Sequence, residues 1–486
     1  MRNKVISQSL FLLFLWIFLV ECAHELYARK KVVLSNEKNI TSQISILDKG
    51  AIYIIAESID FKNNTVKLPE GAILQFEGGC FLNGELIGNN STIIAGRYEI
   101  FREISLSGKW LLDCIPVEWF GAIPNISDYD CSSSINRAIS CGVVIGVPVH
   151  LGAGTYYTKS TIDIPNDGTL VGSAPSSTII SFYHDAAIGV YLHGRNITLK
   201  SVCVTEHRMG RKGICIKVGD TKNAIPCTRG YIEDVKATGG KRGLDLEYQW
   251  CNKISGVNCC YNDIGLYANR TTPYVENAII EANYECGLYS EGSGVKLYNA
   301  VIEGNKVGCV LNGKENFFNN CYFEGNTSSS RNKHSEKDVY GFDVEGGHIF
   351  AGEQTTINNL IMIGCHIVNV DRYNNTIKID KCLNFTSIGC NLLEYLDITE
   401  NCHVKYLDKT YTTVDGYGEY TLASRIHNDV YNGSHSVFYS SNFSGVKVSD
   451  MQVSLDEKGY YIVHGNKSHF VIDEEGNLLC FSKDKV

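Results

Sequence analysis

The sequence predicts an all-β protein that forms a right-handed, single-stranded parallel β-helix with coils of about 22 residues. Three observations predict this fold: a repeat of that length, short alternating apolar segments that end in Gly or Asn, and the composition. The 486 residues include 46 Gly and 28 Tyr but only 8 Pro and 4 Met. A period between about 20 and 50 residues indicates stacked repeat units, and this composition favours strands and turns over helices.

The repeat appears in two independent columns. Segments led by glycine begin at Gly243, Gly265, Gly287, Gly308 and Gly341, with spacings of 22, 22, 21 and 33. A second series ends at Val235, Val257, Ala278, Ala300 and Cys321, with spacings of 22, 21, 22 and 21. A leucine-rich repeat would need a Leu-x-x-Leu-x-Leu pattern, which is absent, so a parallel β-helix is the predicted solenoid.

Alternation along each strand predicts which side chains face the interior. One interior file is expected to hold Leu244, Leu266, Leu288, Cys309 and Phe342. The next residues, Asp245, Tyr267, Tyr289, Val310 and Asp343, are then expected to point outward. Asn262, Asn283, Asn305 and Asn326 recur at 21, 22 and 21 residues and predict a structural Asn ladder at a corner, because Asn tolerates the backbone of sharp turns.

Nineteen cysteines are many for a chain of this kind. There is no CxxC pair and no zinc-like Cys/His spacing. Cys309 and Cys321 stand where other coils place apolar residues, so most cysteines are predicted to be free core residues. A few disulfides remain the alternative.

The chain divides into four predicted segments. A basic start and an 11-residue apolar run, Leu10–Val20, predict a signal peptide over residues 1–23; an uncleaved anchor is the alternative. A strand-rich region over 24–118 opens the solenoid, the β-helix proper covers 119–405, and 406–486 form an all-β tail or cap. A capping helix is expected near 131–141, with Asp130 as its N-cap.

The targeting segment predicts that the mature chain is secreted, periplasmic or on the cell surface, with no further membrane span. Removing residues 1–23 changes the formal net charge from −9 to −10. Such an acidic chain argues against nucleic acid as a partner.

Several motifs resemble a known group of proteins. These are "WFGA" at Trp119, the "INRAI" helix, "VHLGAGTYYTKSTIDIP" from Val149, and "CYFEGN" at Cys321. They are similar to the pectate-lyase-superfamily right-handed β-helix proteins, a group with tailspike-like and polygalacturonase-like members. The region from Leu68 to Trp119 resembles N-terminal parts of exported proteins of the Bacteroidetes type. The resemblance spans roughly residues 45–400 and implies secretion, a polysaccharide or oligosaccharide partner and, through tailspike-like relatives, the option of a homotrimer.

The signatures of known reactions in that group are missing. The sequence has no Asp-Asp or Gly-His-Gly motif of polygalacturonases and no Arg-Pro signature of calcium-dependent pectate lyases. Lys253, Arg242, Arg270 and His366 could serve a lyase, but no spacing groups them. Neither mechanism can therefore be transferred residue by residue.

Two rows of carboxylates are the candidate catalytic groups. The first is Glu281, Glu303 and Glu324, each two residues before a ladder Asn. Coils about 4.8 Å apart bring such side chains close enough for one carboxylate to raise the pKa of the next. The second row contains Asp245 and Asp343. The alternative for the first row is a solvated edge without catalytic function.

Binding residues are predicted along the second row. Tyr267 and Tyr289 could form a platform for a sugar face, with Glu247, Glu291 and Glu345 beside it; a purely structural Tyr ladder is equally compatible. No cofactor and no metal site is predicted, although clustered carboxylates leave Ca²⁺ as an option.

The functional prediction is a polysaccharide-active protein, with a glycoside hydrolase that acts on an acidic or complex polysaccharide as the leading hypothesis. A polysaccharide lyase and a non-catalytic glycan-binding or surface β-helix are the alternatives. Whether the protein is an enzyme is left open, with catalysis favoured.

Overall fold

The computed structural model describes residues 29–326, 347–352, 356–368, 377–379 and 381–390, and the backbone of strands between 396 and 482. The expected signal peptide lies outside the described residues. The chain forms two compact units, Met1–Ile123 with Ser133–Leu151, and Pro124–Ser132 with Gly152–Val486. Among the described helices, none has the length and apolar character needed to cross a bilayer.

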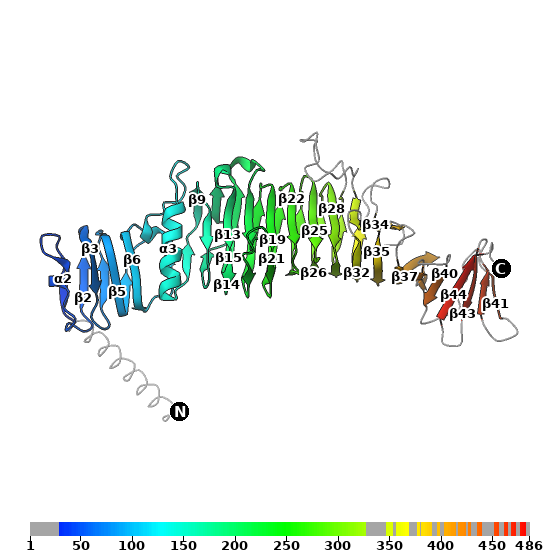
Figure 1. Cartoon of the computed structure of the whole chain (residues 1–486), viewed down its shortest axis with the longest axis horizontal. Coiled ribbons are helices and arrows are strands. Elements are labelled where there is room, and N and C mark those ends of the chain that lie inside the picture. Colours follow the sequence, from blue (N-terminus) through cyan, green and yellow to red (C-terminus); the bar gives the residue numbers. More distant parts are fainter. Residues whose placement is uncertain are drawn as a thin grey trace, which may run out of the picture. The chain divides into compact units, whose positions relative to one another are not determined.

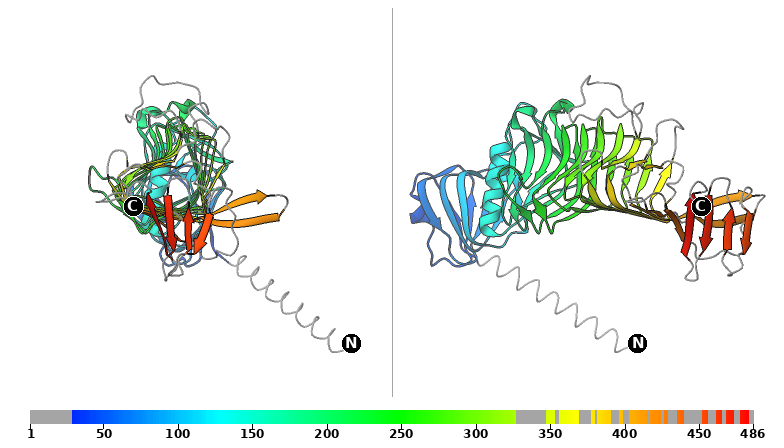
Figure 2. Two further views of the ribbon diagram at one scale, coloured as in Figure 1. Left: turned by 90° about the vertical axis from the view of Figure 1, so that its right-hand side faces the viewer. Right: turned by 45° about the vertical axis from the view of Figure 1, so that its right-hand side comes forward.

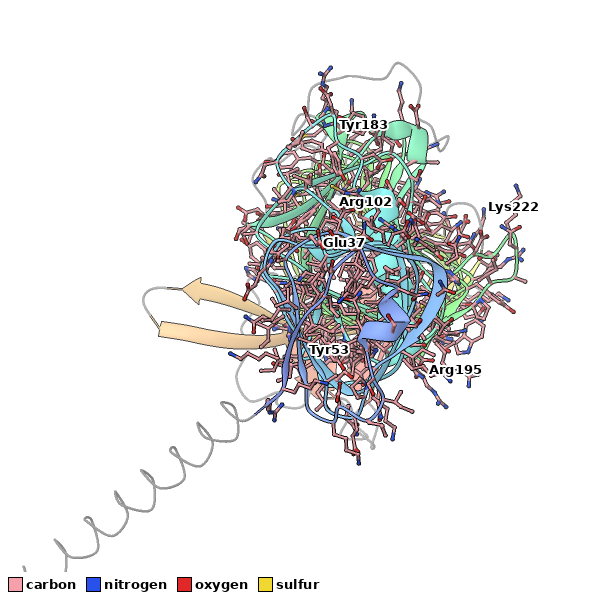
Figure 3. All side chains as sticks on the ribbon, turned by 90° about the vertical axis from the view of Figure 1, so that its left-hand side faces the viewer. Glu37, Tyr53, Arg102, Tyr183, Arg195 and Lys222 are labelled. Carbon is pink, nitrogen blue, oxygen red and sulfur yellow. The ribbon has the colours of Figure 1, made fainter. Side chains whose placement is uncertain are left out.

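The first unit, blue to cyan in Figure 1, is a short stack of parallel strands around aromatic rings. Its strands are β1 (Lys31–Val33), β2 (Ile52–Ile55), β3 (Ile59–Lys67), β4 (Ile73–Phe76), β5 (Phe81–Ile94), β6 (Phe101–Trp110), β7 (Ile115–Pro116) and β8 (Val149–Leu151). The rings of Phe76 and Phe81 lie 5.1 Å apart, and those of Phe76 and Phe101 5.8 Å apart. Tyr53, labelled in Figure 3, is fully buried. A short helix, α2 (Ile40–Gln43), precedes β2.

The predicted helix is present as α3 (Ser132–Ile145) and extends beyond the expected range. Asp130 accepts a hydrogen bond from the backbone N–H of Ser132 at 3.0 Å, as an N-terminal cap does. The apolar face that the sequence indicated, Ile135, Ala138 and Ile139, is buried. Arg137 donates to the Phe120 carbonyl at 2.9 Å, which ties the helix to the 3₁₀ turn η1 (Val117–Phe120) of the first unit.

The second unit is a parallel β-helix, in which successive coils stack along one axis (Figure 2). One face is a ten-stranded sheet: β10 (Ile162–Ile164), β13 (Ile188–Leu192), β16 (Ile214–Val218), β19 (Arg242–Glu247), β22 (Ile264–Asn269), β25 (Cys286–Gly292), β28 (Val307–Gly313), β31 (Gly347–Ala351), β34 (Ile377–Ile379) and β36 (Leu396–Ile398). Every pairing within this sheet is parallel.

A second parallel set, called the long sheet here, completes each coil. Its strands are β9 (Gly154–Thr158), β11 (Thr169–Gly172), β12 (Thr178–Phe182), β15 (Thr198–Glu206), β18 (Tyr231–Thr238), β21 (Lys253–Cys260), β23 (Tyr274–Glu276), β24 (Ile279–Glu281), β26 (Lys296–Tyr298), β27 (Val301–Glu303), β29 (Glu315–Asn319), β30 (Tyr322–Glu324), β32 (Ile357–Ile363), β33 (His366–Val368) and β35 (Cys382–Ile388). Three short strands, β14 (Gly194–Arg195), β17 (Cys227–Thr228) and β20 (Gln249–Trp250), form a small third sheet. Two 3₁₀ turns, η2 (His184–Ala186) and η3 (His207–Met209), complete the unit.

The predicted interior file is confirmed for its first four members. Leu244 pairs with Leu266, Leu266 with Leu288, and Leu288 with Cys309, and all four are buried. The fifth member is wrong: Cys309 pairs with Ile349, whereas Phe342 lies outside the described residues. Cys309 and its partner Ile349 are 40 residues apart in the sequence, not about 22, so the Gly-led segment at Gly341 does not mark the next coil.

The Asn ladder is confirmed and is fully buried. Asn283 donates to Asn305 Oδ1 at 2.9 Å and to the Cys259 carbonyl at 3.0 Å, and its own Oδ1 accepts from the backbone and side chain of Asn262. Asn305 and Asn326 repeat the pattern one coil further. Each amide therefore satisfies backbone groups that a tight corner would otherwise leave unpaired in the interior.

No disulfide joins the sixteen cysteines in the described part of the chain, and most of them are buried. Cys321, Cys365 and Cys390 continue the column of Ala278 and Ala300 at successive corners, as small apolar fillers would.

The strand direction changes near the end of the chain. β37 (His403–Val414) still pairs with β35 in parallel, through Phe385 to Ile388. The remaining strands pair antiparallel: β38 (Tyr417–Ala423), β39 (Ile426–Asn428), β40 (His435–Tyr439), β41 (Gln452–Leu455), β42 (Tyr461–His464), β43 (Ser468–Ile472) and β44 (Asn477–Ser482). Antiparallel pairing marks the end of the coiled architecture.

A buried histidine predicts acid sensitivity of the β-helix. His348 is 0% exposed; its Nδ1 lies 3.1 Å from Asn326 Nδ2, and its Nε2 has no partner among the described residues. Burial lowers the pKa of His348 from 6.5 to about 4. The folded state therefore disfavours the protonated ring, so its stability is complete above pH 6.5 and falls as the pH drops toward 4, by about 3 kcal/mol.

We expect His348→Asn to flatten this acid dependence, because an amide oxygen can accept from Asn326 but does not titrate. Urea unfolding of both proteins between pH 7 and 4 measures the effect. His366→Asn, at an exposed position of the same β-helix, is the matched control. An equally steep acid dependence in the His348 variant would contradict the prediction.

Candidate active site

The outward residues of the ten-stranded sheet form one continuous column. In order of pairing they are Asp163, Tyr191, Lys217, Asp245, Tyr267, Tyr289, Val310 and Phe350. The run from Asp245 to Val310 is the one expected from the sequence. Phe350, not Asp343, pairs with Val310, and the candidates Asp343 and Glu345 both lie outside the described residues.

Asp245 is a fully buried carboxyl group with two different oxygens. Its Oδ2 lies 2.7 Å from Arg242 Nη1, whereas Oδ1 is buried and has no hydrogen-bond partner among the described residues. Burial raises the pKa of Asp245 to about 6, with the Glu247 charge adding to the effect and Arg242 opposing it. A carboxyl group with this environment can hold a proton near neutral pH, as general acids must.

Glu247, two residues further along β19, is the second carboxylate of the cluster. Its Oε1 lies 3.6 Å from the same Arg242 Nη1. Its Oε2 accepts from the Thr221 backbone N–H at 3.0 Å and lies 4.0 Å from Lys217 Nζ. One guanidinium therefore holds the two carboxylates close together, while opposite charges and an amide surround Glu247.

No spacing in the sequence linked Arg242 to the acidic candidates, yet it lies at the centre of this cluster. Its guanidinium carbon lies 3.5 Å from the centre of the Tyr267 ring, so it contacts two acids and one aromatic ring. Its position follows from the parallel register, in which Arg242 pairs with Ile264 at the start of the strands. The signal in the sequence was its spacing, three residues before Asp245 and five before Glu247.

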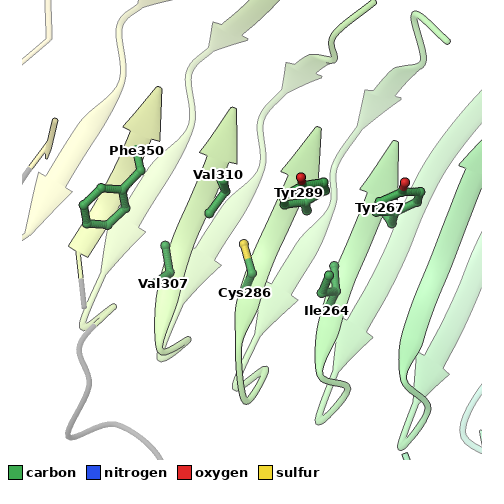
Figure 4. Packing of buried hydrophobic residues seen from close by; sticks show 7 residues of the cluster. All are labelled: Ile264, Tyr267, Cys286, Tyr289, Val307, Val310 and Phe350. Atoms are coloured by element: carbon green, nitrogen blue, oxygen red, sulfur yellow. The ribbon is translucent and has the colours of Figure 1, made fainter. Parts of the chain in front are cut away.

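The two tyrosines differ from the open platform that the sequence suggested. Their rings stack on each other with centres 5.5 Å apart and planes within 2°. They are only 5% and 4% exposed, and Figure 4 shows them with Ile264, Cys286, Val307, Val310 and Phe350. Their ring faces are thus turned toward each other along the column, which leaves the hydroxyl groups as the polar features.

Both hydroxyl groups reach Glu291. Tyr267 donates to Glu291 Oε1, and Tyr289 lies 3.4 Å from Oε2. Burial, with Glu291 contributing, raises the pKa of Tyr289 to about 12. Glu247 and Glu291 are half-buried and form the more accessible side of the cluster, above the buried Asp245.

The other candidate row is also stacked as expected. Glu281 pairs with Glu303, and Glu303 with Glu324, all on the long sheet and half-buried. Burial raises the pKa of Glu303, and the charges of Glu281 and Glu324 raise it further. Tyr322 donates to Glu324 at 2.8 Å. No cation of the described chain forms an ion pair with this row.

The sequence candidates therefore fall on two different sheets. The structure brings Asp245, Glu247, Tyr267, Tyr289 and Glu291 together on the ten-stranded sheet, with Arg242 and Lys217 as additions. The Glu281 row lies on the long sheet. Neither place, within the residues that the structure describes, gathers three His, Cys, Asp or Glu side chains in an arrangement that could hold a metal ion.

Comparisons with known proteins find similarity of structure only. The chain is similar to Geobacillus virus E2 ORF18, with 13% identity, 76% of both chains covered and a TM-score of 0.40. It is also similar to the Agl-KA catalytic domain, with 14% identity over 61% of this chain and 64% of that chain and a TM-score of 0.40. For the Dettilon tailspike protein the identity is 12%, the coverage 76% and 91%, and the TM-score 0.35.

In sequence, no family model and no curated protein matches the chain. The parallel β-helix is established by the strand registers themselves.

Proposed function

We propose that the protein is a polysaccharide-active β-helix enzyme, a glycoside hydrolase whose acid/base pair is Asp245 and Glu247. The observation that carries this proposal is the asymmetry of Asp245, a fully buried carboxyl group with one oxygen bound by Arg242 and the other without a partner. An orphaned buried oxygen is costly to a fold, so it needs an explanation, and a proton held ready for transfer supplies one.

In the proposed mechanism, Asp245 is the general acid. Because Oδ2 is engaged by Arg242, the proton resides on Oδ1. That oxygen is buried, so the mechanism requires that substrate binding opens a path between Oδ1 and the leaving glycosidic oxygen, which then receives the proton. Glu247 is the second carboxylate and attacks the anomeric carbon or activates water. Their oxygens lie 2.7 and 3.6 Å from a single nitrogen, a closeness that favours the retaining geometry of about 5–5.5 Å between carboxyl groups over the wider inverting one.

The local charge balance favours hydrolysis over β-elimination. A lyase acting on a uronate needs a free cation to neutralise the substrate carboxylate. Here Arg242 is already engaged by Asp245 and Glu247, and Lys217 by Asp220 at 3.2 Å. We therefore expect a neutral sugar at the bond that is cleaved, even where the polymer carries acidic groups elsewhere.

Product analysis on a panel of neutral and acidic polysaccharides tests the proposal. New reducing ends without the ultraviolet absorbance of an unsaturated sugar indicate hydrolysis. Reducing ends with that absorbance would replace the proposal by a lyase. No product from any polymer would replace it by a non-catalytic role.

That non-catalytic role is the second candidate, and the burial of the tyrosines favours it. Rings that are 4–5% exposed stabilise stacked strands whether or not a sugar binds. Retention of the protein on a glycan column without cleavage of that glycan would identify a binding module.

A further inference from the structure

We infer that Arg211 forms a second binding subsite at the corner where the long sheet passes into the ten-stranded sheet. The subsite holds an anionic group of the polysaccharide, a carboxylate or a sulfate ester, on a sugar other than the one that is cleaved. This inference rests on the proposed function and deepens it, because it names the polymer as one that combines neutral and anionic sugars in one chain. The subsite is built by the loop His207–Lys212 and by corner residues of later coils.

The loop has an unusual and firmly held backbone. Three of its non-glycine residues have a left-handed backbone, with φ of 58°, 50° and 53°: Arg208, Met209 and Arg211. Such a conformation persists where the surroundings impose it, and it is common at functional sites. Glu206, only 1% exposed, imposes it here, because its Oε2 accepts from the backbone N–H groups of Lys212 and Gly213 at 2.8 Å each.

The Arg211 side chain is anchored at two points. Its Nη1 lies 3.1 Å from Asp263 Oδ1, and its guanidinium carbon lies 4.0 Å from the centre of the Tyr284 ring. The loop directly precedes β16, whereas Asp263 directly precedes β22 and Tyr284 lies just before β25. The side chain therefore reaches across the corners of successive coils, and the ion pair and the ring together fix the plane of the guanidinium.

The other edge of the same guanidinium is open. Nε and Nη2 of Arg211 have no hydrogen-bond partner in the described part of the chain, and both remain accessible to solvent. This edge presents two parallel N–H groups, a spacing that matches two oxygens of a carboxylate or a sulfate ester. Arg211 is thus held on one side and free on the other, which pre-organises it for an anion.

The corner is basic although the chain is acidic. The loop contains three cations and no acid, whereas the whole chain has a formal net charge of −9. Arg208 and Lys212 are exposed and form no ion pair with a described residue. Lys241 lies near Asp263 and, with Arg211, opposes the rise in the pKa of Asp263 that burial causes.

The acids of this corner do not cancel that charge. Glu206 is buried under the loop and accepts its backbone N–H groups, and Asp263 is paired with Arg211. Glu285, half-buried on the coil of Tyr284, is the other acid at the corners that the Arg211 side chain crosses. The exposed cations of the loop and Lys241 outnumber it, so an anion is attracted to this place.

Three half-buried rings next to the loop favour a sugar as the carrier of the anion. The centre of the His207 ring lies 4.4 Å from that of Tyr183 and 5.7 Å from that of Tyr157. The Tyr183 hydroxyl donates to the Ser127 carbonyl at 2.7 Å, which fixes the outer ring. Aromatic faces beside hydrogen-bond donors suit the apolar and polar sides of a saccharide.

The subsite adjoins the proposed catalytic pair. Lys241 and Asp263 directly precede Arg242 and Ile264, which pair with each other at the start of the ten-stranded sheet. A polymer with one sugar at the catalytic pair can therefore continue onto this corner. The guanidinium at the catalytic pair is engaged by two carboxylates, whereas the outer edge of Arg211 is free. Neutral and anionic sugars thus have separate places, and a polymer of uronates alone is disfavoured.

Affinity electrophoresis of the full chain tests the subsite. The gels contain hyaluronan, whose anionic groups are carboxylates, carboxyl-reduced chondroitin sulfate, whose anionic groups are sulfate esters, or neutral dextran. We expect at least one anionic polymer to retard the protein and dextran to leave its mobility unchanged, and the polymer that retards it identifies the anion. Equal mobility in all three gels would overturn the inference.

Substitutions assign the retardation to Arg211. Arg211→Gln should weaken binding at least about tenfold, because a charge-assisted bidentate contact is lost. The double variant Arg211→Gln/Asp263→Asn should lose as much, although it has the net charge of the wild type and leaves no unpaired Asp263 carboxylate to disturb folding. Arg195→Gln, at an exposed position labelled in Figure 3, is the matched control and should bind like the wild type. Full affinity in the double variant, or an equal loss in the control, would show that Arg211 is not the receptor.

Binding and cleavage can fail separately in these experiments. On an anionic polymer that the protein cleaves, Arg211→Gln should raise KM at least about tenfold and leave kcat unchanged. Cleavage without Arg211-dependent binding would remove the subsite and keep the hydrolase. Arg211-dependent binding without cleavage of any polymer would keep the subsite and remove the hydrolase.

Discussion

Asp245→Asn is expected to lower the rate of glycan hydrolysis at least about 100-fold, because an amide cannot donate the proton that the leaving oxygen requires. The variant keeps the shape of the side chain and one acceptor for Arg242, so most of the loss should appear in kcat rather than KM. In the wild-type enzyme, activity should fall as the pH rises above about 6, the pKa to which burial raises Asp245, since the acid must be protonated to act. The pH profile of kcat for both proteins measures this.

The controls for this experiment separate catalysis from folding. Removing the charge of Asp245 leaves the half-buried Arg242 beside one carboxylate instead of two, which costs stability as well, so thermal melting has to accompany the kinetics. Glu247→Gln should lose activity comparably, while Glu233→Gln, at an exposed carboxylate of the long sheet, should not. Full activity in Asp245→Asn with an unchanged pH profile would remove Asp245 from the mechanism.

Asn283→Ala is expected to destabilise the β-helix by about 4 kcal/mol, the largest effect that we expect from any single ladder residue. The substitution leaves the Asn262 backbone N–H and the Cys259 carbonyl without their partners in a fully buried place. Each unsatisfied buried group costs about 1–3 kcal/mol, and Asn305 also loses a donor to its side-chain oxygen. Urea unfolding measures the change in free energy.

A second Asn row provides the comparison for that prediction. Asn277, Asn299 and Asn320 also stack, but they are exposed and adopt a left-handed backbone. Asn299→Gly retains that backbone conformation and should change stability by less than about 1 kcal/mol. Similar losses in both variants would mean that the buried ladder owes its contribution to something other than satisfied polar groups.

The fold was predictable because positions about 22 residues apart in the sequence have to meet the same structural requirement. Leu244, Leu266 and Leu288 each had to be apolar, and Asn262, Asn283 and Asn305 each had to satisfy a corner, so periodicity alone placed them. The register failed at Gly341, where an insertion separated the two coils and a chance Gly-led segment imitated the repeat.

The candidate site was only half predictable for a related reason. The repeat spacing predicted that the residues from Asp245 to Tyr289 stack in one column. It could not predict how far neighbouring side chains bury an outward-pointing residue. Tyr267 was expected to be open and is buried. Arg242 breaks the apolar pattern in its own column, where Ile264 and Cys286 follow, and such an exception marks a site only when its neighbours in space are known.

Because the coils of the second unit stack in register, the length of the β-helix can change in steps of one coil. A Cβ on Gly243 would lie 2.6 Å from Gly265 O, and a Cβ on Gly265 would lie 2.7 Å from Gly287 O, so successive coils approach each other through the same glycine contact. Duplicating residues 277–298 as a block would therefore add one coil and leave every side chain with the same kind of neighbours as before. A β-helix of this kind can become longer by whole coils, while the side chains of each existing coil keep their arrangement.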